Sequence, residues 1–207
     1  MIYELCVVQK GDASEAEVAK TAELVRTSIS GFNGEVLVED NWGVKTLAQA
    51  TSTGKATGNY TYFIYKAEAG ANQEVNRRLL IDESVMKFGL FKLDEKLDVA
   101  TIVKTYKTPF STKHNGSVLD ELEESSGESA KDRRRFSRGK SCWFKANGVT
   151  ADWKEPQTYN WLVNEFGKIS AARVTGISRK HQRFVNTAIK RARNLGVLSH
   201  ISSRTLG

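Results

Sequence analysis

The sequence predicts an α+β protein in which an antiparallel sheet with two helices precedes a small, mainly α-helical basic domain. The first observation is that the apolar residues of 1–96 follow patterns typical of strands in some segments and of helices in others. The second is the division of charge: residues 1–128 carry 14 basic and 20 acidic side chains, whereas residues 129–207 carry 17 and 4. The formal charge of +7 therefore averages a half at −6 and a half at +13. Such asymmetry favours a polyanion-binding half joined to a half with another role.

Residue type and a cap indicate the first strand and the first helix. Residues 2–9 are apolar and rich in β-branched side chains, which is typical of a strand. Ser14 and Glu17 have the spacing of a capping box, in which the serine caps a helix and the glutamate bonds back to the cap amide. An apolar stripe at helical spacing follows, and Gly31 comes after its last member. The stripe consists of Val18, Ala22, Val25 and Ile29.

Three further strands and one helix complete the first domain. Residue type and alternation predict strands in the first, second and last of these segments, and Val75 and Leu79 mark the inner face of the helix. The segments are residues 35–40, continued through 41–51 past a bend where Trp42 packs, then 60–67, the helix 72–81, and 85–93. The order βαββαβ is that of the ferredoxin-like unit, an antiparallel sheet with two helices on one face. We assign this domain to residues 1–96.

Residues 97–131 are predicted to be a flexible acidic linker. Pro109 and two glycines interrupt any periodicity there, and residues 120–129 are acidic or small. Residues 132–207 then form the basic domain, which begins with an arm in which aromatic and basic residues alternate irregularly. Its remaining elements are a helix over 156–166, a turn region over 168–177, and a helix over 178–195 that Ser178 caps and Gly196 closes.

On a helical wheel, the last helix has one apolar stripe and one basic face. The apolar stripe contains Phe184, Val185, Ala188, Ile189, Ala192 and Leu195, with His181 on the same side as a packed histidine. The basic face contains Arg179, Lys180, Arg183, Lys190, Arg191 and Arg193. Glu165 is the one carboxylate side chain in residues 156–207, so this face needs an external anion.

Nucleic acid is the anion that the sequence favours. A membrane surface would also attract a basic amphipathic helix, but the apolar stripe is needed to pack against the 156–166 segment. Arginine pairs bidentately with phosphate and stacks on bases. Phe136, Trp143 and Phe144 either stack on unpaired bases or lie in the core, and the sequence leaves both open. The candidate RNA-binding residues are Arg133, Arg134, Arg135, Arg138, Lys140, Lys145, Lys168, Arg173, Arg179, Lys180, Arg183, Lys190, Arg191 and Arg193.

Catalysis, a cofactor, a small-molecule substrate, a metal site and a membrane span are not expected. No apolar run approaches the length of a membrane span. Cys6 and Cys142 are too few for a disulfide scaffold or a structural zinc site, which favours a cytoplasmic protein with structural thiols. Small hydrolases of the ferredoxin-like fold need a phosphate-binding basic loop after the first strand, but residues 9–12 contain one lysine and no arginine. The histidines at 114, 181 and 200 form no visible site with a nucleophile.

Residues from about 133 to 198 resemble bacterial small-subunit ribosomal protein eighteen. The resemblance is carried by the stretches 140–144, 165–169 and 173–176, and above all by Gln182-Arg183 followed by Ala188-Ile189-Lys190-Arg191-Ala192-Arg193. It implies a protein that binds small-subunit ribosomal RNA beside neighbouring small-subunit proteins.

Residues 1–96 resemble small-subunit ribosomal protein six, although more loosely. The matching residues are Tyr3-Glu4-Leu5, Asp40, Trp42-Gly43, Leu47-Ala48, Gly58-Asn59-Tyr60 and 85–88, with Asn41 as an apparent insertion. In the two families these are separate chains that bind each other on ribosomal RNA. The resemblance therefore implies a fusion, natural or engineered, that stabilises the platform of the small subunit, with contact between its two domains. An RNA-binding regulator or chaperone outside the ribosome is the alternative.

Overall fold

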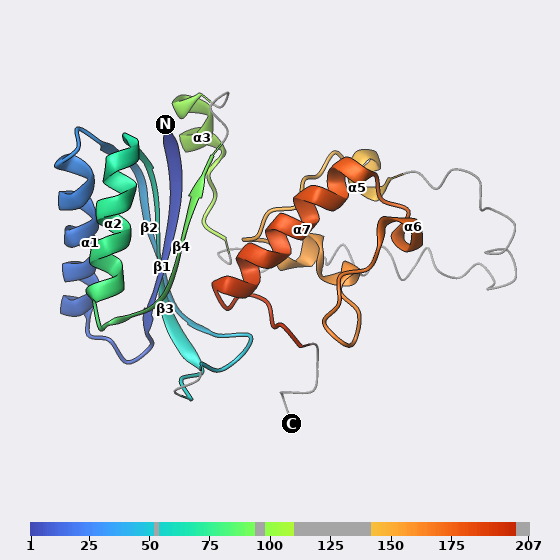
Figure 1. Ribbon diagram of the computed structural model, residues 1–207, viewed down its shortest axis with the longest axis horizontal. Helices are drawn as coiled ribbons and strands as arrows, with labels where there is room; N and C mark the ends of the chain where they lie inside the picture. The colour runs from blue at the N-terminus through green and yellow to red at the C-terminus, as the bar shows by residue number, and fades with distance from the viewer. Residues whose placement is uncertain (52–53, 94–97, 110–141, 202–207) are drawn as a thin grey trace, which may run out of the picture.

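The computed structural model describes residues 1–51, 54–93, 98–109 and 142–201. Figure 1 shows a central sheet with two helices on one side and the C-terminal half of the chain on the other. The strands are β1 (Ile2–Lys10), β2 (Glu35–Thr46), β3 (Thr57–Lys66) and β4 (Val85–Lys92), in the order β2-β3-β1-β4. Every pair of neighbouring strands is antiparallel. The predicted ferredoxin-like unit is confirmed.

Helices α1 (Glu15–Ser30) and α2 (Ala69–Ile81) cover one face of the sheet. The predicted capping box is present: the Ser14 hydroxyl accepts from the Glu17 amide, and the Glu17 carboxylate accepts from the Ser14 amide at 2.8 Å. Side chains point alternately to the two faces along a strand. Leu5 and Val7 accordingly pack with α1 and α2.

The opposite face of the sheet is also buried, because the second half of the chain lies on it. All residues of β1 except Lys10 are buried, including Cys6 and Val8 on this second face. The bend predicted at Trp42 is a β-bulge between Asn41 and Gly43, and the Trp42 side chain packs into the same core. The core between sheet and C-terminal half therefore belongs to both domains.

The basic domain contains three described helices, α5 (Trp143–Ala146), α6 (Ala172–Thr175) and α7 (Arg179–Asn194). The N-cap predicted at Ser178 is confirmed, because its hydroxyl accepts from the His181 amide. Helix α7 has its C-terminal end toward the sheet and its N-terminal end away from it (Figure 1). This orientation decides which of its cations remain free.

The prediction of a helix over residues 156–166 is wrong. The structure has two short 3-10 turns, Pro156–Thr158 and Asn160–Leu162. Tyr159 and Leu162 are buried three residues apart, which is the period of a 3-10 turn, and Phe166 is 73% exposed. The Asn164 side chain accepts the Phe166 and Lys168 amides at 3.0 and 2.7 Å. It thereby offers the backbone an alternative to helical hydrogen bonds.

The prediction of a flexible linker over 97–131 does not fit its first part. Helix α3 (Val99–Thr105) lies there, and Val99, Ile102 and Tyr106 pack against the core of the second sheet face. The Tyr106 hydroxyl donates to Asp40 at 2.7 Å and accepts from the Trp42 indole at 3.0 Å. The acidic run 120–129, which carried the prediction, lies outside the described residues.

Candidate nucleic-acid interface

A buried ion pair fixes the C-terminal half on the sheet. Glu4 of β1 is 2% exposed, and its carboxylate accepts from the Lys154 ammonium at 2.7 Å and the Tyr62 hydroxyl at 2.6 Å. The Trp153 indole donates to the same carboxylate at 3.2 Å. Burial alone would lower the pKa of Lys154, but the carboxylates of Glu4 and Asp152 outweigh it and raise the pKa. Lys154 is therefore charged, and three donors surround the buried carboxylate.

Aromatic rings fill the space around this pair. The Trp153 ring is 2% exposed, and its centroid lies 5.9 Å from that of Trp42, 6.5 Å from Tyr62 and 6.1 Å from Phe91. Trp42 and Tyr62 stack at 5.0 Å. Trp153 thus joins β2, β3 and β4 into one packed cluster with the second half.

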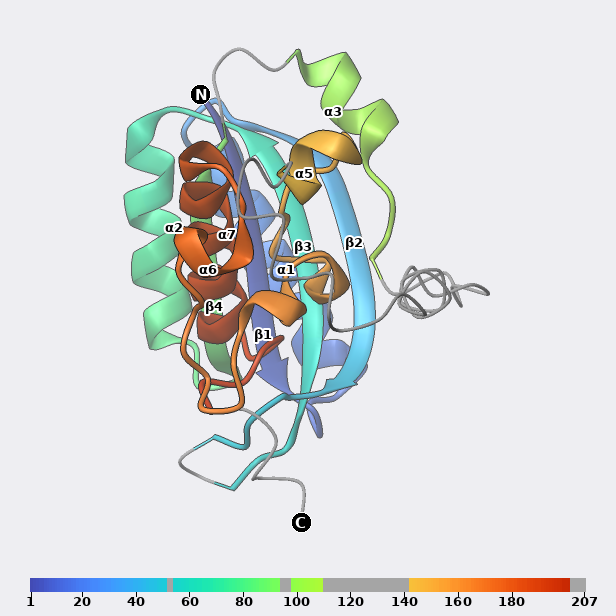
Figure 2. The same cartoon turned by 90° about the vertical axis from the view of Figure 1, so that its right-hand side faces the viewer.

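The C-terminal end of α7 contacts the sheet through backbone groups. The Tyr60 hydroxyl donates to the Leu195 carbonyl at 2.8 Å, and the Ala48 amide donates to the Gly196 carbonyl at 2.8 Å. Figure 2 shows α7 in front of β4 when the second half faces the viewer. These contacts fix the orientation of α7 relative to the first domain.

We expect Gly196→Ala to destabilise the fold by more than Gly43→Ala. Both glycines have a φ of +74°, where a side chain costs about 1–2 kcal/mol. A Cβ at position 43 meets nothing within 4 Å, whereas at position 196 it meets Leu47 Cδ2 at 2.9 Å. Urea unfolding of both variants measures the difference. We call the packed interface between the sheet and the second half of the chain the seam. Equal losses would show that Leu47 moves away freely and that the seam is not tightly packed at Gly196.

The exposed cations of the second half form no ion pair with the part of the chain that the structure describes. Seven predicted RNA-binding residues are exposed, and none forms an ion pair with any residue that the structure describes. They are Lys145 of α5, Lys168, Arg173 of α6, and Arg179, Lys180, Arg183 and Lys190 of α7. Unpaired exposed cations on one domain form a surface for an anion.

Arg191 and Arg193 are held by the protein instead. The Arg191 guanidinium lies 4.4 Å from the centroid of the Phe91 ring, in a cation–π contact with β4. Arg193 donates to the carbonyls of Gly167 and Ser199, and burial lowers its pKa. The wheel placed both residues on the free basic face. Their position near the sheet end of α7 explains the difference.

Of the predicted aromatic residues, Phe144 lies in the core and Trp143 is half-buried. The His181 ring stacks on Phe144 at 5.6 Å, so the packed histidine is confirmed. Its Nδ1 lies 3.3 Å from the Cys142 sulfur. Burial raises the pKa of Cys142, but the backbone amides of Ser178 and Lys145 outweigh it and lower that pKa. Phe136 and the basic residues at 133, 134, 135, 138 and 140 lie outside the described residues.

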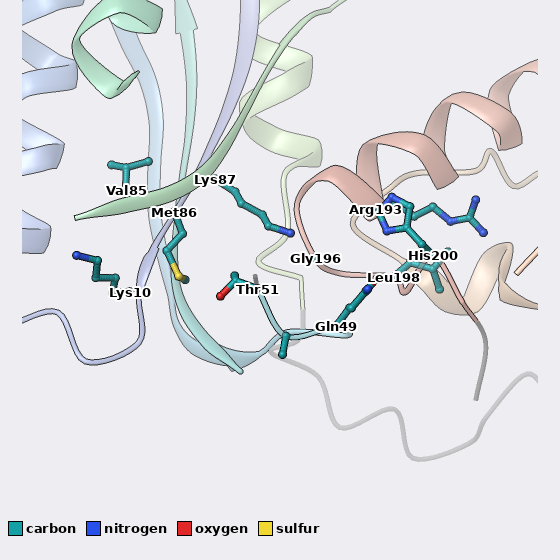
Figure 3. Close-up of a pocket in the computed structure, with 11 residues that line it drawn as sticks. Lys10, Gln49, Thr51, Val85, Met86, Lys87, Arg193, Gly196, Leu198 and His200 are labelled. Carbon is teal, nitrogen blue, oxygen red and sulfur yellow. The ribbon is translucent and has the colours of Figure 1, made fainter. Parts of the chain in front are cut away.

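A depression of about 540 Å³ lies where the two halves meet. Figure 3 shows Lys87 extending from β4 toward the segment of Leu198 and His200. Among the described residues, its lining contains Lys10, Lys87, Arg193 and His200 and no acidic side chain. The sequence patterns did not indicate Lys87 as a candidate residue. Its signal was the strand register, because Lys87 pairs with Val8, whose side chain lies on the same sheet face as the second half.

No described helix is long and apolar enough to cross a membrane. The residues that the structure describes also contain no group of three or more histidine, cysteine, aspartate or glutamate side chains placed to hold a metal ion.

Fold and site together define a two-domain protein in which a ferredoxin-like sheet carries a basic domain whose exposed cations have no ion-pair partner among the described residues. The family model of ribosomal protein S18 matches residues 147–198, and that of ribosomal protein S6 matches residues 2–92. The small ribosomal subunit protein bS18 of Pelobacter propionicus is 47% identical over 75 residues, which are 36% of this chain and 80% of that protein. The bS18 of Staphylococcus aureus strain JH9 is 45% identical over 65 residues, 31% of this chain and 81% of that protein.

The chain belongs to the bS18 family through its C-terminal part and is a fusion of that protein with an N-terminal ribosomal protein S6 domain. Among solved structures, ribosomal protein S6 of Thermotoga maritima has a TM-score of 0.41 at 19% identity. The matched region covers 44% of this chain and 84% of the Thermotoga maritima chain. The predicted resemblance to both families is confirmed.

Proposed function

We propose that the chain is a structural constituent of the small ribosomal subunit, binds ribosomal RNA, and stabilises the platform as a fused pair of partner proteins in the cytoplasm. The observation that carries the proposal is the set of seven exposed cations without partners among the described residues. Polyanions release counterions when lysine and arginine neutralise their phosphates, which makes such a surface suited to RNA. The proposal contains no catalytic step, metal, cofactor or small-molecule substrate.

The two domains have different roles in this proposal. The first, residues 1–96, holds the second in place through the Glu4–Lys154 pair and the aromatic cluster. The second, residues 132–207, presents its cations to RNA, and residues 97–131 join them. A tethered partner has an effective concentration of millimolar order for a short flexible connection, which favours docking within one chain. Neighbouring small-subunit proteins are further partners.

Replacing Arg183 and Lys190 together with glutamine is expected to weaken RNA binding and to flatten its salt dependence. Both side chains are exposed on α7, with no ion pair to a described residue. Each lost phosphate contact lowers the slope of log K against log salt by about 0.7–0.9. In the double variant, the magnitude of the slope of log K against log salt should therefore fall by roughly 1.4–1.8. The affinity at 0.1 M salt should fall by about 25- to 60-fold. Filter binding to central-domain ribosomal RNA over a salt series measures both.

The matched control is Lys20→Gln with Lys66→Gln, which removes the same charge from exposed positions of the first domain. This control should leave the salt slope almost unchanged. An equal loss in both variants would attribute binding to net charge and contradict the assigned surface. Equal affinity of the unaltered protein for random RNA at matched salt would favour the regulator outside the ribosome.

A further inference from the structure

Two of the exposed aromatic side chains of the basic domain lie at the ends of a row of rings. Trp161 is 44% exposed and Phe184 is 46% exposed. The buried Phe144 ring lies 6.4 Å from the Trp161 ring at an interplanar angle of 25°, and 5.6 Å from His181. His181 lies in turn 6.5 Å from Phe184. Each exposed ring thus has part of its surface packed on the protein and part open.

Both rings are held in place before any ligand binds. The Trp161 indole donates to the Thr158 carbonyl at 3.1 Å, and its ring meets Trp143 edge-on at 5.8 Å. Phe184 packs against His181, whose Nδ1 lies 2.8 Å from the hydroxyl of the helix cap Ser178. A rigid aromatic side chain loses little conformational entropy when it binds. The two rings are therefore preorganised contact surfaces.

The charge around the rings indicates the kind of ligand. Lys180 lies one helical turn before Phe184, and Arg183 is adjacent to it. Lys145 follows Phe144 in α5. None of these cations forms an ion pair with a described residue. Aromatic rings among free cations match single-stranded nucleic acid, which presents base faces for stacking and phosphates for charge.

We propose that Trp161 and Phe184 form a stacking platform for unpaired RNA bases, while the adjacent cations bind the phosphates. This inference rests on the proposed RNA-binding function. It adds that the two rings recognise the bases of the RNA rather than its phosphates. Stacking on an aromatic side chain contributes about 5- to 150-fold in affinity per base. Stacking tolerates any base because every base has a flat face. It requires a base that is not already stacked in a duplex, so the platform selects single-stranded over paired RNA.

The test compares two RNA probes of equal charge on the full chain. One is a 12-nucleotide single-stranded RNA of mixed sequence, and the other has the same length and phosphates but abasic sugars. Trp161→Leu and Phe184→Leu are each expected to weaken binding of the first probe by about 5- to 150-fold without changing its salt slope. Binding of the abasic probe should be unchanged. Phe32→Leu, at a 40% exposed phenylalanine of the first domain, is the matched control and should alter neither.

Three outcomes would overturn the platform. Unchanged affinity of both leucine variants for the first probe would do so, as would an equal loss on the abasic probe. Normal RNA binding with poor comigration of the variants with small subunits would assign the rings to a neighbouring protein instead. Failure of the proposed function is distinguishable, because the Arg183→Gln with Lys190→Gln variant would then leave the salt slope unchanged. Far-UV circular dichroism of each variant confirms that it folds.

Discussion

Lys154→Met is expected to lower the free energy of unfolding by about 3–5 kcal/mol, because it leaves the Glu4 carboxylate buried without its cation. The Tyr62 and Trp153 donors remain, but neither carries charge. Urea unfolding followed by tryptophan fluorescence measures the loss. Since the pKa of Lys154 is raised, the lysine remains charged below the ordinary lysine pKa, and its contribution to stability is present there. That contribution is lost as the pH rises through the raised value.

Two controls separate a buried charge from a lost contact. Lys55→Met breaks the exposed pair with Asp12, in which the side chains are 45% and 63% exposed, and should cost less than about 1 kcal/mol. Adding Glu4→Gln to Lys154→Met should recover more than half of the loss, because it removes the unpaired charge. If the double variant were as unstable as Lys154→Met alone, the loss would come from packing and the ion pair would not fix the seam.

The first domain could be predicted from sequence because its signals are local. Ser14 and Glu17 are three residues apart, and the strands alternate over their own length. Helix α3 and the 3-10 turns could not be predicted in this way. Tyr106 is ordered by Asp40 and Trp42, which lie more than sixty residues earlier, so no window around Tyr106 contains the cause. Tertiary contacts decide such short elements, whereas residues 2–10 and 179–194 have strong patterns of their own.

The sequence predicted that the last helix carries a cationic face, but not which of its cations are exposed. The wheel placed six cations of the last helix on one face, yet it contains no information about where the sheet lies. Arg191 contacts the Phe91 ring of β4 and Arg193 donates to backbone carbonyls, while Arg183 is exposed and forms no ion pair with a described residue. The same limit affected Phe184, which the wheel placed in the apolar stripe although it lies on the half of α7 away from the sheet. Periodicity identifies a face, and the packing partner decides how far along the helix that face is covered.

Trp153→Ala is expected to destabilise the fold by about 3–5 kcal/mol, because it empties the centre of the seam. The ring touches Trp42, Tyr62 and Phe91 on three strands, so the surrounding sheet cannot collapse onto the space. The substitution also removes a donor from the buried Glu4 carboxylate. Urea unfolding measures the loss, and the matched variant is Trp153→Phe.

Trp153→Phe keeps one aromatic ring, so it leaves a smaller cavity than alanine does, and it removes the indole N–H that donates to Glu4. It should cost less than the alanine variant but at least about 1–3 kcal/mol, the penalty for an unmade buried hydrogen bond. The difference between the two variants then measures the further cavity that alanine leaves. Because Trp153 packs on Trp42 and Tyr62, opening of the seam at Trp153 would expose parts of both rings as well. Native-state hydrogen exchange of β3 amides should therefore rise in the alanine variant before global unfolding. Equal stability of the alanine and unaltered chains would show that the second half is not held on the sheet at Trp153.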